Sequence, residues 1–367
     1  MYKLSMYQVI CVVSTGILPL LFWVYPRYAA FYGGIDGQWA VFGVCFFALF
    51  SALVHGLLTT NLRTQTGVEM LTLVFGKFIG RIVGTSFIPG YLLFIAVSLY
   101  SFAITVKAIL PNTPHLATGV ALALVSVVGA LYGLETIARV ASITFPVVML
   151  VLGTSFALAY FRGTWTGVTL HPVSVSRSFS VAGLLLPLFL GINLYLMVNP
   201  YFDHRKQNAI WLPLVAAGFG CLYAAGVFVV ILRVVGYEGV RVLAHPVDFV
   251  LQLVQVQGFI IQRFGVSLIF VATLFQAVFY ANHLWGISEL SRRLLQLNKS
   301  SEKWFVLGYA VIVLVIFQLI PNQQVWDWIV ITLLVPLSWL YLIIEPTVKL
   351  MVFYIRRRHL KPASGQL

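Results

Sequence analysis

Ten long stretches without a charged residue constrain the fold of this chain more than any other feature of its sequence. Each stretch has at least 17 residues and contains no Asp, Glu, Lys or Arg. A bilayer core is crossed by about 20 apolar residues, and a backbone in lipid satisfies its hydrogen bonds only as a helix or a closed barrel. We therefore expect one membrane crossing in each of the runs 4–26, 37–62, 82–106, 108–134, 140–161, 178–202, 207–232, 264–288, 304–326 and 328–344.

Composition and local pattern favour helices over a barrel. The chain is 60% apolar and only 9% charged, whereas an ordinary soluble protein has about 25% charged residues. Barrel strands alternate apolar and polar positions over about ten residues, but residues 120–125, Val-Ala-Leu-Ala-Leu-Val, are apolar on every face. The sequence therefore predicts an all-α integral membrane protein with ten transmembrane helices in one domain, 1–367.

The distribution of basic residues predicts the orientation in the membrane. The formal net charge is +13, and 16 of the 23 Lys and Arg residues fall in the loops of one side if alternate loops share a side. Basic loops usually remain cytoplasmic, so both termini are expected inside. The short tail 356–367, which begins Arg-Arg-Arg-His, is expected to meet the anionic inner leaflet. The membrane orientation accounts for the positive charge, and we expect no nucleic-acid partner.

The sequence contains no recognisable enzyme motif. A P-loop, an HExxH zinc motif and a nucleophile elbow are all absent. Cys11, Cys45 and Cys221 lie in apolar runs without the paired spacing of a metal or redox site, and we interpret them as small buried side chains. We expect no catalysis, no metal and no cofactor, although coupling to Na⁺ through backbone carbonyls stays open.

Ten helices divide into two sets of five, and many transporters are built as inverted repeats of this kind. The first repeat would cover about 4–161 and the second about 178–355. Helix one then corresponds to helix six, and both contain helix breakers in mid-membrane, at 14–19 (Ser-Thr-Gly-Ile-Leu-Pro) and 187–193 (Pro-Leu-Phe-Leu-Gly-Ile-Asn). Glycine permits unusual backbone angles and proline removes a donor, so we expect both helices to be broken beside a cavity.

Several short motifs resemble a known family. The segments 26–27 (Pro-Arg), 34–39 (Gly-Ile-Asp-Gly-Gln-Trp), 110–114 (Leu-Pro-Asn-Thr-Pro) and 132–139, with its Gly-x-Glu-x-x-x-Arg element, are similar to those of B subunits of GerA-type spore-germination nutrient receptors. That family belongs to the amino acid, polyamine and organocation transporter superfamily. The resemblance implies a LeuT-type fold with five-plus-five inverted repeats, a location in the spore inner membrane, and a small germinant such as an amino acid or a sugar.

The resemblance also implies partners, and the sequence departs from the family at two places. The expected partners are the A subunit and the lipoprotein C subunit of the receptor. Many family members carry Gly-x-Glu in helix six, where this chain has Gly191-Ile192-Asn193. The Arg-x-Asp pattern before helix eight is absent, since Arg263 is followed by Phe264 and Gly265. A neutral amide in place of a carboxylate puts proton coupling or an ionic ligand contact at that position in doubt.

The ligand site is expected at the two broken helices. Free backbone N–H groups at half-helix starts attract a carboxylate, so backbone contacts are expected from the first break and from the glycine of the second. Analogy with the superfamily adds wall residues from helices three and eight. The expected site comprises Ser14, Thr15, Gly16, Ile17, Ser98, Tyr100, Gly191, Asn193, Phe279 and Tyr280.

Two histidines and two charged pairs are the ionisable groups of interest. His55 and His283 lie inside apolar runs, and each is either a hydrogen-bonded packing residue or part of a water or proton path. Glu135 and Arg139, at i and i+4, are expected to form a structural ion pair. Glu345, four residues before Lys349, is either a headgroup-level anchor for that lysine or a gate contact.

Two connecting segments are predicted to form short helices at the membrane interface. Residues 245–257 mix apolar and polar positions at helical spacing, with Pro246 near the start. Residues 68–78 form a similar piece on the inner side. Each either covers helix ends or acts as a gate.

Three functional classes remain open from the sequence. A receptor subunit that senses a nutrient and signals through partners fits best, because membrane carboxylates and a large soluble domain are both missing. The alternative is an amino-acid permease that works by alternating access. A channel would need a continuous polar track, for which His55, Asn193 and His283 are too few.

Overall fold

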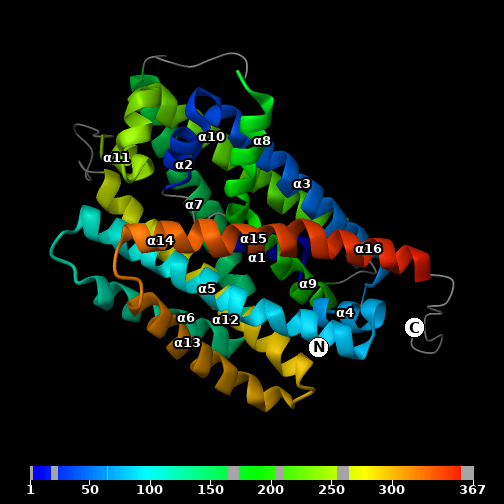
Figure 1. Ribbon diagram of the computed structural model, residues 1–367. Coiled ribbons are helices and arrows are strands. Elements are labelled where there is room, and N and C mark those ends of the chain that lie inside the picture. Colours follow the sequence, from blue (N-terminus) through cyan, green and yellow to red (C-terminus); the bar gives the residue numbers. More distant parts are fainter. Residues whose placement is uncertain are drawn as a thin grey trace.

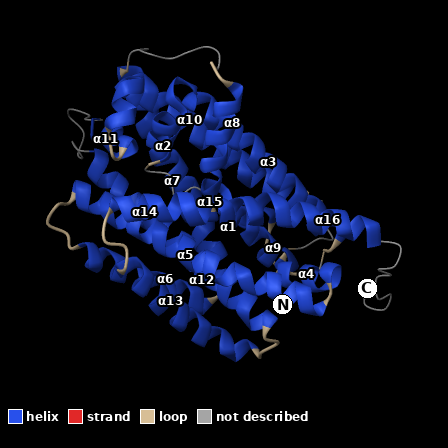
Figure 2. Cartoon of the chain, in the orientation of Figure 1, coloured by secondary structure: helices blue, strands red, loops and turns tan. Residues whose placement is uncertain are grey.

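The computed structural model of the chain describes residues 3–17, 24–63, 65–163, 173–202, 210–253 and 264–356. The described residues are helical throughout and contain no named strand, only an isolated bridge between Leu4 and Phe202 (Figure 2). The prediction of an all-α fold is therefore confirmed. The basic tail after Arg356 lies outside the described residues.

The first half of the chain follows the predicted runs. Its first run is occupied by a short helix that stops in mid-run, and a small helix, α4, precedes the third crossing. The elements are α1 (Met6–Gly16), α2 (Tyr25–Gly33), η1 (Gly34–Asp36), α3 (Gly37–Asn61), α4 (Gly67–Phe75), α5 (Lys77–Ile109), α6 (His115–Tyr132) and α7 (Leu134–Arg162).

The second half begins with an interrupted crossing and ends with a long one. In the last crossing, α-helical and π-helical turns alternate along a single rod (Figure 1). The elements are α8 (Val175–Leu184), η2 (Leu186–Asn193), α9 (Leu194–Val198), η3 (Asn199–Tyr201), α10 (Trp211–Val242), α11 (Pro246–Leu253), α12 (Phe264–Leu294), η4 (Lys299–Ser301), α13 (Glu302–Gln318), α14 (Gln323–Ile329), η5 (Val330–Leu334), α15 (Val335–Ser338), η6 (Trp339–Ile344) and α16 (Glu345–Arg356).

Length and hydropathy alone identify seven membrane-spanning helices among the described residues. An eighth is the bent pair formed by α8 and residues 186–201, which meet at 49°. The remaining two predicted runs contain α1, which is apolar but short, and α12. Helix is thus present in all ten runs, and the protein is an integral membrane protein.

Helices that the inverted repeat relates to one another pack together. The first crossing, α1, contacts η2 and α9 of the sixth; α3 packs on α10; and α5 packs on α12. These are the pairs one and six, two and seven, and three and eight. The repeat boundaries at 4–161 and 178–355 stay a prediction. The arrangement places both interrupted helices in the middle of the bundle, where η2 is buried along its whole length.

The two predicted surface helices lie at opposite ends of the bundle (Figure 1). Helix α4 begins with a capping box between Thr66 and Glu69 and ends before Gly76, whose φ of 89° suits glycine. Helix α11 has Pro246 as its first residue and turns its apolar side inward. Residues 254–257, at the end of the predicted segment 245–257, lie outside the described residues.

Cysteine labelling tests the predicted orientation. Glu135 at the start of α7 and Glu238 in α10 have exposed side chains, 42% and 78% accessible. In a background without the three native cysteines, we expect Glu238→Cys to react with a membrane-impermeant maleimide in intact cells. Glu135→Cys should react only after permeabilisation, because its loop is predicted to be cytoplasmic. The reverse pattern would invert the topology.

Candidate functional site

The first crossing is interrupted where the sequence predicts. Helix α1 ends at Gly16, and Ile17 adopts an extended backbone with φ −86° and ψ −178°. The next described helix, α2, begins at Tyr25 and has Pro26 in its first turn. Pro19, which belongs to the predicted break, lies outside the described residues. The carbonyls at the end of α1 therefore lack the partners that a continuous helix would supply.

The sixth crossing is interrupted over the predicted residues as well. Helix α8 ends at Leu184, and η2, a 3₁₀ segment with Pro187 in its first turn, leads into α9. Proline supplies no N–H for the α-helical ladder, which accounts for the change of helix type at this point. Both broken helices of the predicted fold are thus present.

The two breaks touch through glycine. A Cβ atom on Gly191 would collide with the carbonyl oxygen of Gly16, and one on Gly16 would lie 2.6 Å from Cδ1 of Leu194. Gly191 is required because the backbone of α1 approaches it closely and not because of a positive φ, whereas a Cβ on Gly16 would meet the end of the Leu194 side chain. From the sequence, Gly191 is expected to face a cavity. In this closed conformation it packs directly on the end of α1 instead.

Helix α12 supplies hydrogen bonds to the open end of α1. Nε2 of His283 donates to the carbonyl of Gly16 at 3.2 Å. The Asn282 amide donates to the carbonyl of Val12 at 2.8 Å and to Oγ1 of Thr15 at 3.0 Å. These contacts satisfy carbonyls that the break leaves free. His283 is therefore a hydrogen-bonded residue of the site, and Asn282, beside it in the sequence, is a functional candidate that the sequence analysis missed.

Other predicted side chains surround the breaks without protein partners. The hydroxyls of Ser14, Ser98 and Tyr280 are buried and make no hydrogen bond of ordinary length in the described part of the chain, although those of Ser98 and Tyr280 are near neighbours. Ser98 on α5 and Tyr280 on α12 lie beside each other. Buried polar atoms normally have a partner, so these hydroxyls are available for a bound polar molecule.

Two predicted wall residues have other surroundings. The Tyr100 ring packs on His115 and Phe317, at centroid distances of 5.1 and 6.3 Å. It therefore faces α6 and α13, away from Ser98. Phe279 packs against the ring of His283 at 4.3 Å, which orients that histidine.

A row of polar groups continues along α5 and α12 from Ser98 toward the end of the bundle that the predicted orientation places outside; we call it the outer end and the opposite end the inner end. Ser101 and Thr105 follow at helical spacing on α5, and Gln276 precedes Tyr280 by one turn on α12. Each has a buried polar atom without a partner among the described residues. The spacing i, i+3, i+7 of hydroxyl residues in an apolar helix is the sequence signal that could have revealed this row.

The outer end of this row is covered by α11. Asp248 is 2% exposed, and burial raises the pKa of its carboxyl well above the usual range, while Thr105 beside it lowers that pKa. Burial, with a contribution from Arg27, lowers the pKa of His245 to about 4, so this imidazole is uncharged at neutral pH. Its Nδ1 lies 3.9 Å from Asp248.

Contacts between α2 and α14 close the outer side further. The Tyr28 hydroxyl donates to Asp327 at 2.5 Å, and the Gln323 amide donates to the same oxygen at 3.0 Å. The ring of Tyr28 stacks on Trp326 at 6.2 Å, and the indole N–H of Trp326 donates to the carbonyl of Val97 at 2.8 Å.

A small cavity lies on the inner side of the breaks. Its volume is ≈ 40 Å³, room for about three waters, since one water needs about 10–15 Å³. Four of its fourteen lining residues are polar, namely Tyr91, Asn193, His283 and Lys349. Nε2 of His55 donates to Oδ1 of Asn193 at 2.7 Å. His55 is thus part of the site through Asn193.

Glu345 and Lys349 form the expected pair, at 2.7 Å, but both side chains are buried, 4% and 1% exposed. The interpretation as a headgroup-level anchor is therefore wrong, because Lys349 faces the cavity and not the lipid surface. Glu135 and Arg139 form their expected pair at 2.7 Å on the exposed surface, where such a pair contributes about 0–1 kcal/mol.

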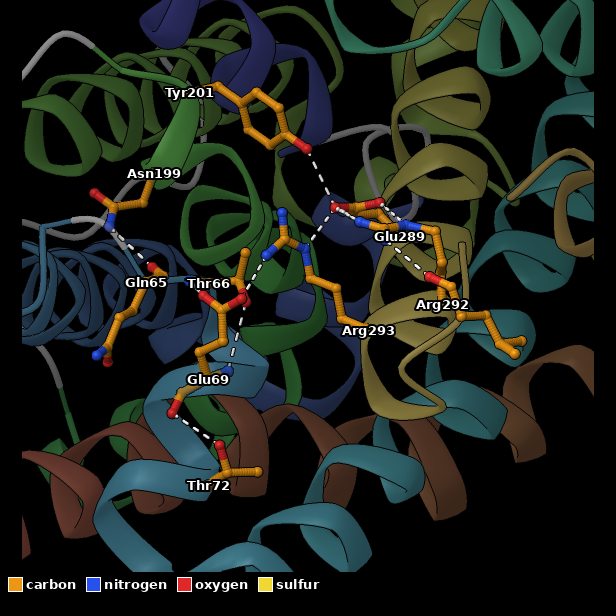
Figure 3. Close-up of polar contacts among 10 residues, drawn as sticks. Gln65, Thr66, Glu69, Thr72, Asn199, Tyr201, Glu289, Arg292 and Arg293 are labelled. Carbon is orange, nitrogen blue, oxygen red and sulfur yellow. Dashed lines mark hydrogen bonds and ion pairs between the residues drawn. The ribbon is translucent and has the colours of Figure 1, made fainter. Parts of the chain in front are cut away.

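An ion-pair cluster closes the inner side, and we call it the inner latch (Figure 3). Arg293 on α12 pairs with Glu289 one turn earlier and with Glu69 on α4, each at 2.5 Å. Tyr201 donates to Glu289 at 3.1 Å, and its own carbonyl accepts from the N–H of Leu4 at 2.7 Å. The latch thereby joins α4, α12, the end of the sixth crossing and the segment before α1.

Comparison with known proteins identifies the family. A model of the family described as spore germination protein, Spore_permease, matches residues 3–325. The chain belongs to this family. The resemblance noted from the short motifs is thus confirmed, and no curated protein matches the chain.

Solved structures show the fold. The crystal structure of MhsT in complex with L-phenylalanine matches with a TM-score of 0.65 at 11% identity, over 93% of this chain and 88% of that one. This spore germination protein therefore has the predicted LeuT-type fold.

Substitution of Gly191 tests the contact between the breaks. We expect Gly191→Ala to destabilise the protein by about 1–3 kcal/mol or more, because the added methyl meets backbone that cannot move aside. Gly218→Ala on α10 is the control, since a Cβ there meets nothing within 4 Å. The melting temperatures of the purified variants measure the difference. Equal melting temperatures would show that the breaks are not packed in this way.

Neutralising Glu289 tests the inner latch. Its side chain is 1% exposed, and removing one member of such a buried pair costs about 3–5 kcal/mol. In a cysteine-free background with Ile287→Cys in the cavity wall, we expect Glu289→Gln to accelerate thiol labelling from the inner side several-fold. Glu135→Gln, in the exposed pair, is the matched control. An unchanged labelling rate would show that the latch does not close the inner side.

Proposed function

We propose that this chain is the membrane subunit of a spore germinant receptor that binds an amino acid or a sugar between the broken helices. The observation that carries the proposal is the meeting of the two breaks at Gly16 and Gly191, surrounded by the unpartnered hydroxyls of Ser14, Ser98 and Tyr280. Hydroxyl and amide groups recognise both carboxylates and sugar hydroxyls. Family membership supplies the germination context.

Binding would act on the two closures that flank the breaks. A nutrient that enters between Gly16 and Gly191 must move α1 relative to η2, and α1 is connected through Leu4 to Tyr201 and the inner latch. A ligand changes a conformational equilibrium only through its different affinities for the two states. We propose that the change in the latch is transmitted to an A subunit and a lipoprotein C subunit. The chain would lie in the spore inner membrane with both of its termini in the cytoplasm.

A second function, an amino-acid permease, is supported by one specific observation. Closures lie on both sides of the breaks, with Tyr28 and Asp327 on one side and Arg293 and Glu289 on the other. Alternating access needs two such closures around one site. The family name Spore_permease agrees with this alternative, and Na⁺ coupling belongs to it.

Measuring uptake and binding in one preparation distinguishes the receptor from the permease. The purified chain in liposomes is given labelled amino acids and simple sugars, with and without a Na⁺ or proton gradient. We expect saturable binding without accumulation, weakened about ten-fold by Ser98→Ala, which removes one hydrogen bond to the ligand. Ser180→Ala, on the exposed side of α8, is the control. Saturable accumulation inside the vesicles would establish the permease, and the absence of any binding would contradict both functions.

A further inference from the structure

The cavity on the inner side of the breaks has a charged residue, Lys349, in its wall. Lys349 lines it, whereas Glu345, its partner, is not among the lining residues. The ammonium donates one hydrogen bond to Oε1 of Glu345 at 2.7 Å. Its other two N–H groups have no partner among the described residues. Lys349 is therefore the member of the buried pair that lines the cavity.

A second donor faces the same space. Asn193 in η2 uses Oδ1 for its contact with His55, and its Nδ2, which lies beside the Tyr91 hydroxyl, makes no hydrogen bond of ordinary length in the described part of the chain. Tyr91, from α5, donates its hydroxyl to the carbonyl of Leu190 at 3.2 Å and so contributes mainly its ring. The polar side of the cavity thus offers one charged and one neutral donor.

The rest of the cavity wall is apolar. It includes Val68 and Leu71 of α4, Leu196 of α9, and Ile287 and Leu290 of α12. A carboxylate without a counter-charge is costly in such surroundings, but beside an ammonium it forms a charge-assisted hydrogen bond. A sugar would leave most of its hydroxyls against hydrocarbon. The wall therefore suits a short aliphatic chain, and the polar end suits a carboxylate.

We propose that this cavity binds the carboxylate of a small aliphatic nutrient, with Lys349 as the charge partner and Asn193 as the second donor. This inference rests on the proposed function and narrows its ligand class from amino acids and sugars to aliphatic carboxylates. The present volume of ≈ 40 Å³ is too small for such a ligand. The wall formed by α4 must therefore move outward, and the pair between Glu69 and Arg293 holds that wall in place.

Equilibrium binding of labelled probes to the purified full-length chain tests the proposal. The probes are L-leucine, 3-methylbutanoate, L-leucinamide, D-glucose and chloride. The variants are Lys349→Met and the double variant Glu345→Gln/Lys349→Met, which avoids an unpaired buried carboxylate. Lys77→Met, which removes an exposed lysine at the start of α5, is the control. Melting temperatures exclude variants that do not fold.

We expect the native chain and Lys77→Met to bind leucine and 3-methylbutanoate but not leucinamide. Both Lys349 variants should bind the two carboxylates at least about ten-fold more weakly, as expected for the loss of a hydrogen bond to a charged group. Unchanged affinity in the double variant would overturn the assignment of Lys349. Binding of glucose or leucinamide alone would overturn the carboxylate class but leave the receptor function. Binding of chloride alone would reassign the cavity to inorganic anions. Binding of no probe would overturn the aliphatic-carboxylate proposal, whereas the proposed function would be contradicted only if the full panel of amino acids and sugars also failed to bind.

Discussion

The close packing of a carbonyl group on a glycine is the contact on which the centre of this protein depends. The carbonyl of Gly16 lies against Gly191 so closely that no side chain fits between them. His283 donates to the same carbonyl at 3.2 Å. Because the break ends the helical ladder, this carbonyl would otherwise be buried without a partner, which costs free energy. Two interrupted helices are thereby held together, and α5 and α12 are arranged around them.

Burial of charge is the second constraint, and the structure meets it by pairing. Within the bundle, the carboxylate of Glu345 lies 2.7 Å from Lys349, and Glu289 lies between Arg292 and Arg293. An unpaired charge at these depths would be strongly unfavourable. These pairs lie within single helices, and Arg293 also joins α12 to α4 through Glu69. The inner latch and the lysine-lined cavity share α4, which contributes residues to both.

The features that the sequence predicts are those with a local physical cause. Charge-free runs locate the helices because lipid excludes charge. Gly16, Pro187 and Gly191 locate the breaks because glycine has no side chain and proline has no backbone N–H. The pair of Glu135 and Arg139 is one helical turn apart and needs no tertiary information. The resemblance to the germinant receptor family also rests on contiguous motifs, and the family match agrees with it.

The features that the sequence does not predict depend on which helix faces which. Arg293 and Glu69 are 224 positions apart, and no periodicity connects them. Ser98 and Tyr100 are two residues apart, yet only Ser98 lies by the breaks, because the direction of α5 is set by its packing on α12. Lys349 looks like an interfacial residue near a helix end, and it is buried because α16 packs on α3 and α4. Gly191 was expected to face a cavity, but its role here is close packing.

Hydrogen–deuterium exchange with and without a bound nutrient tests the central claim most directly. The amides at the end of α1, residues 14–17, and those of η2, Leu186–Asn193, form the contact between the breaks. If a nutrient binds there, both segments should change their exchange together when a saturating ligand from the binding panel is added. A change confined to segments away from both breaks would contradict the account.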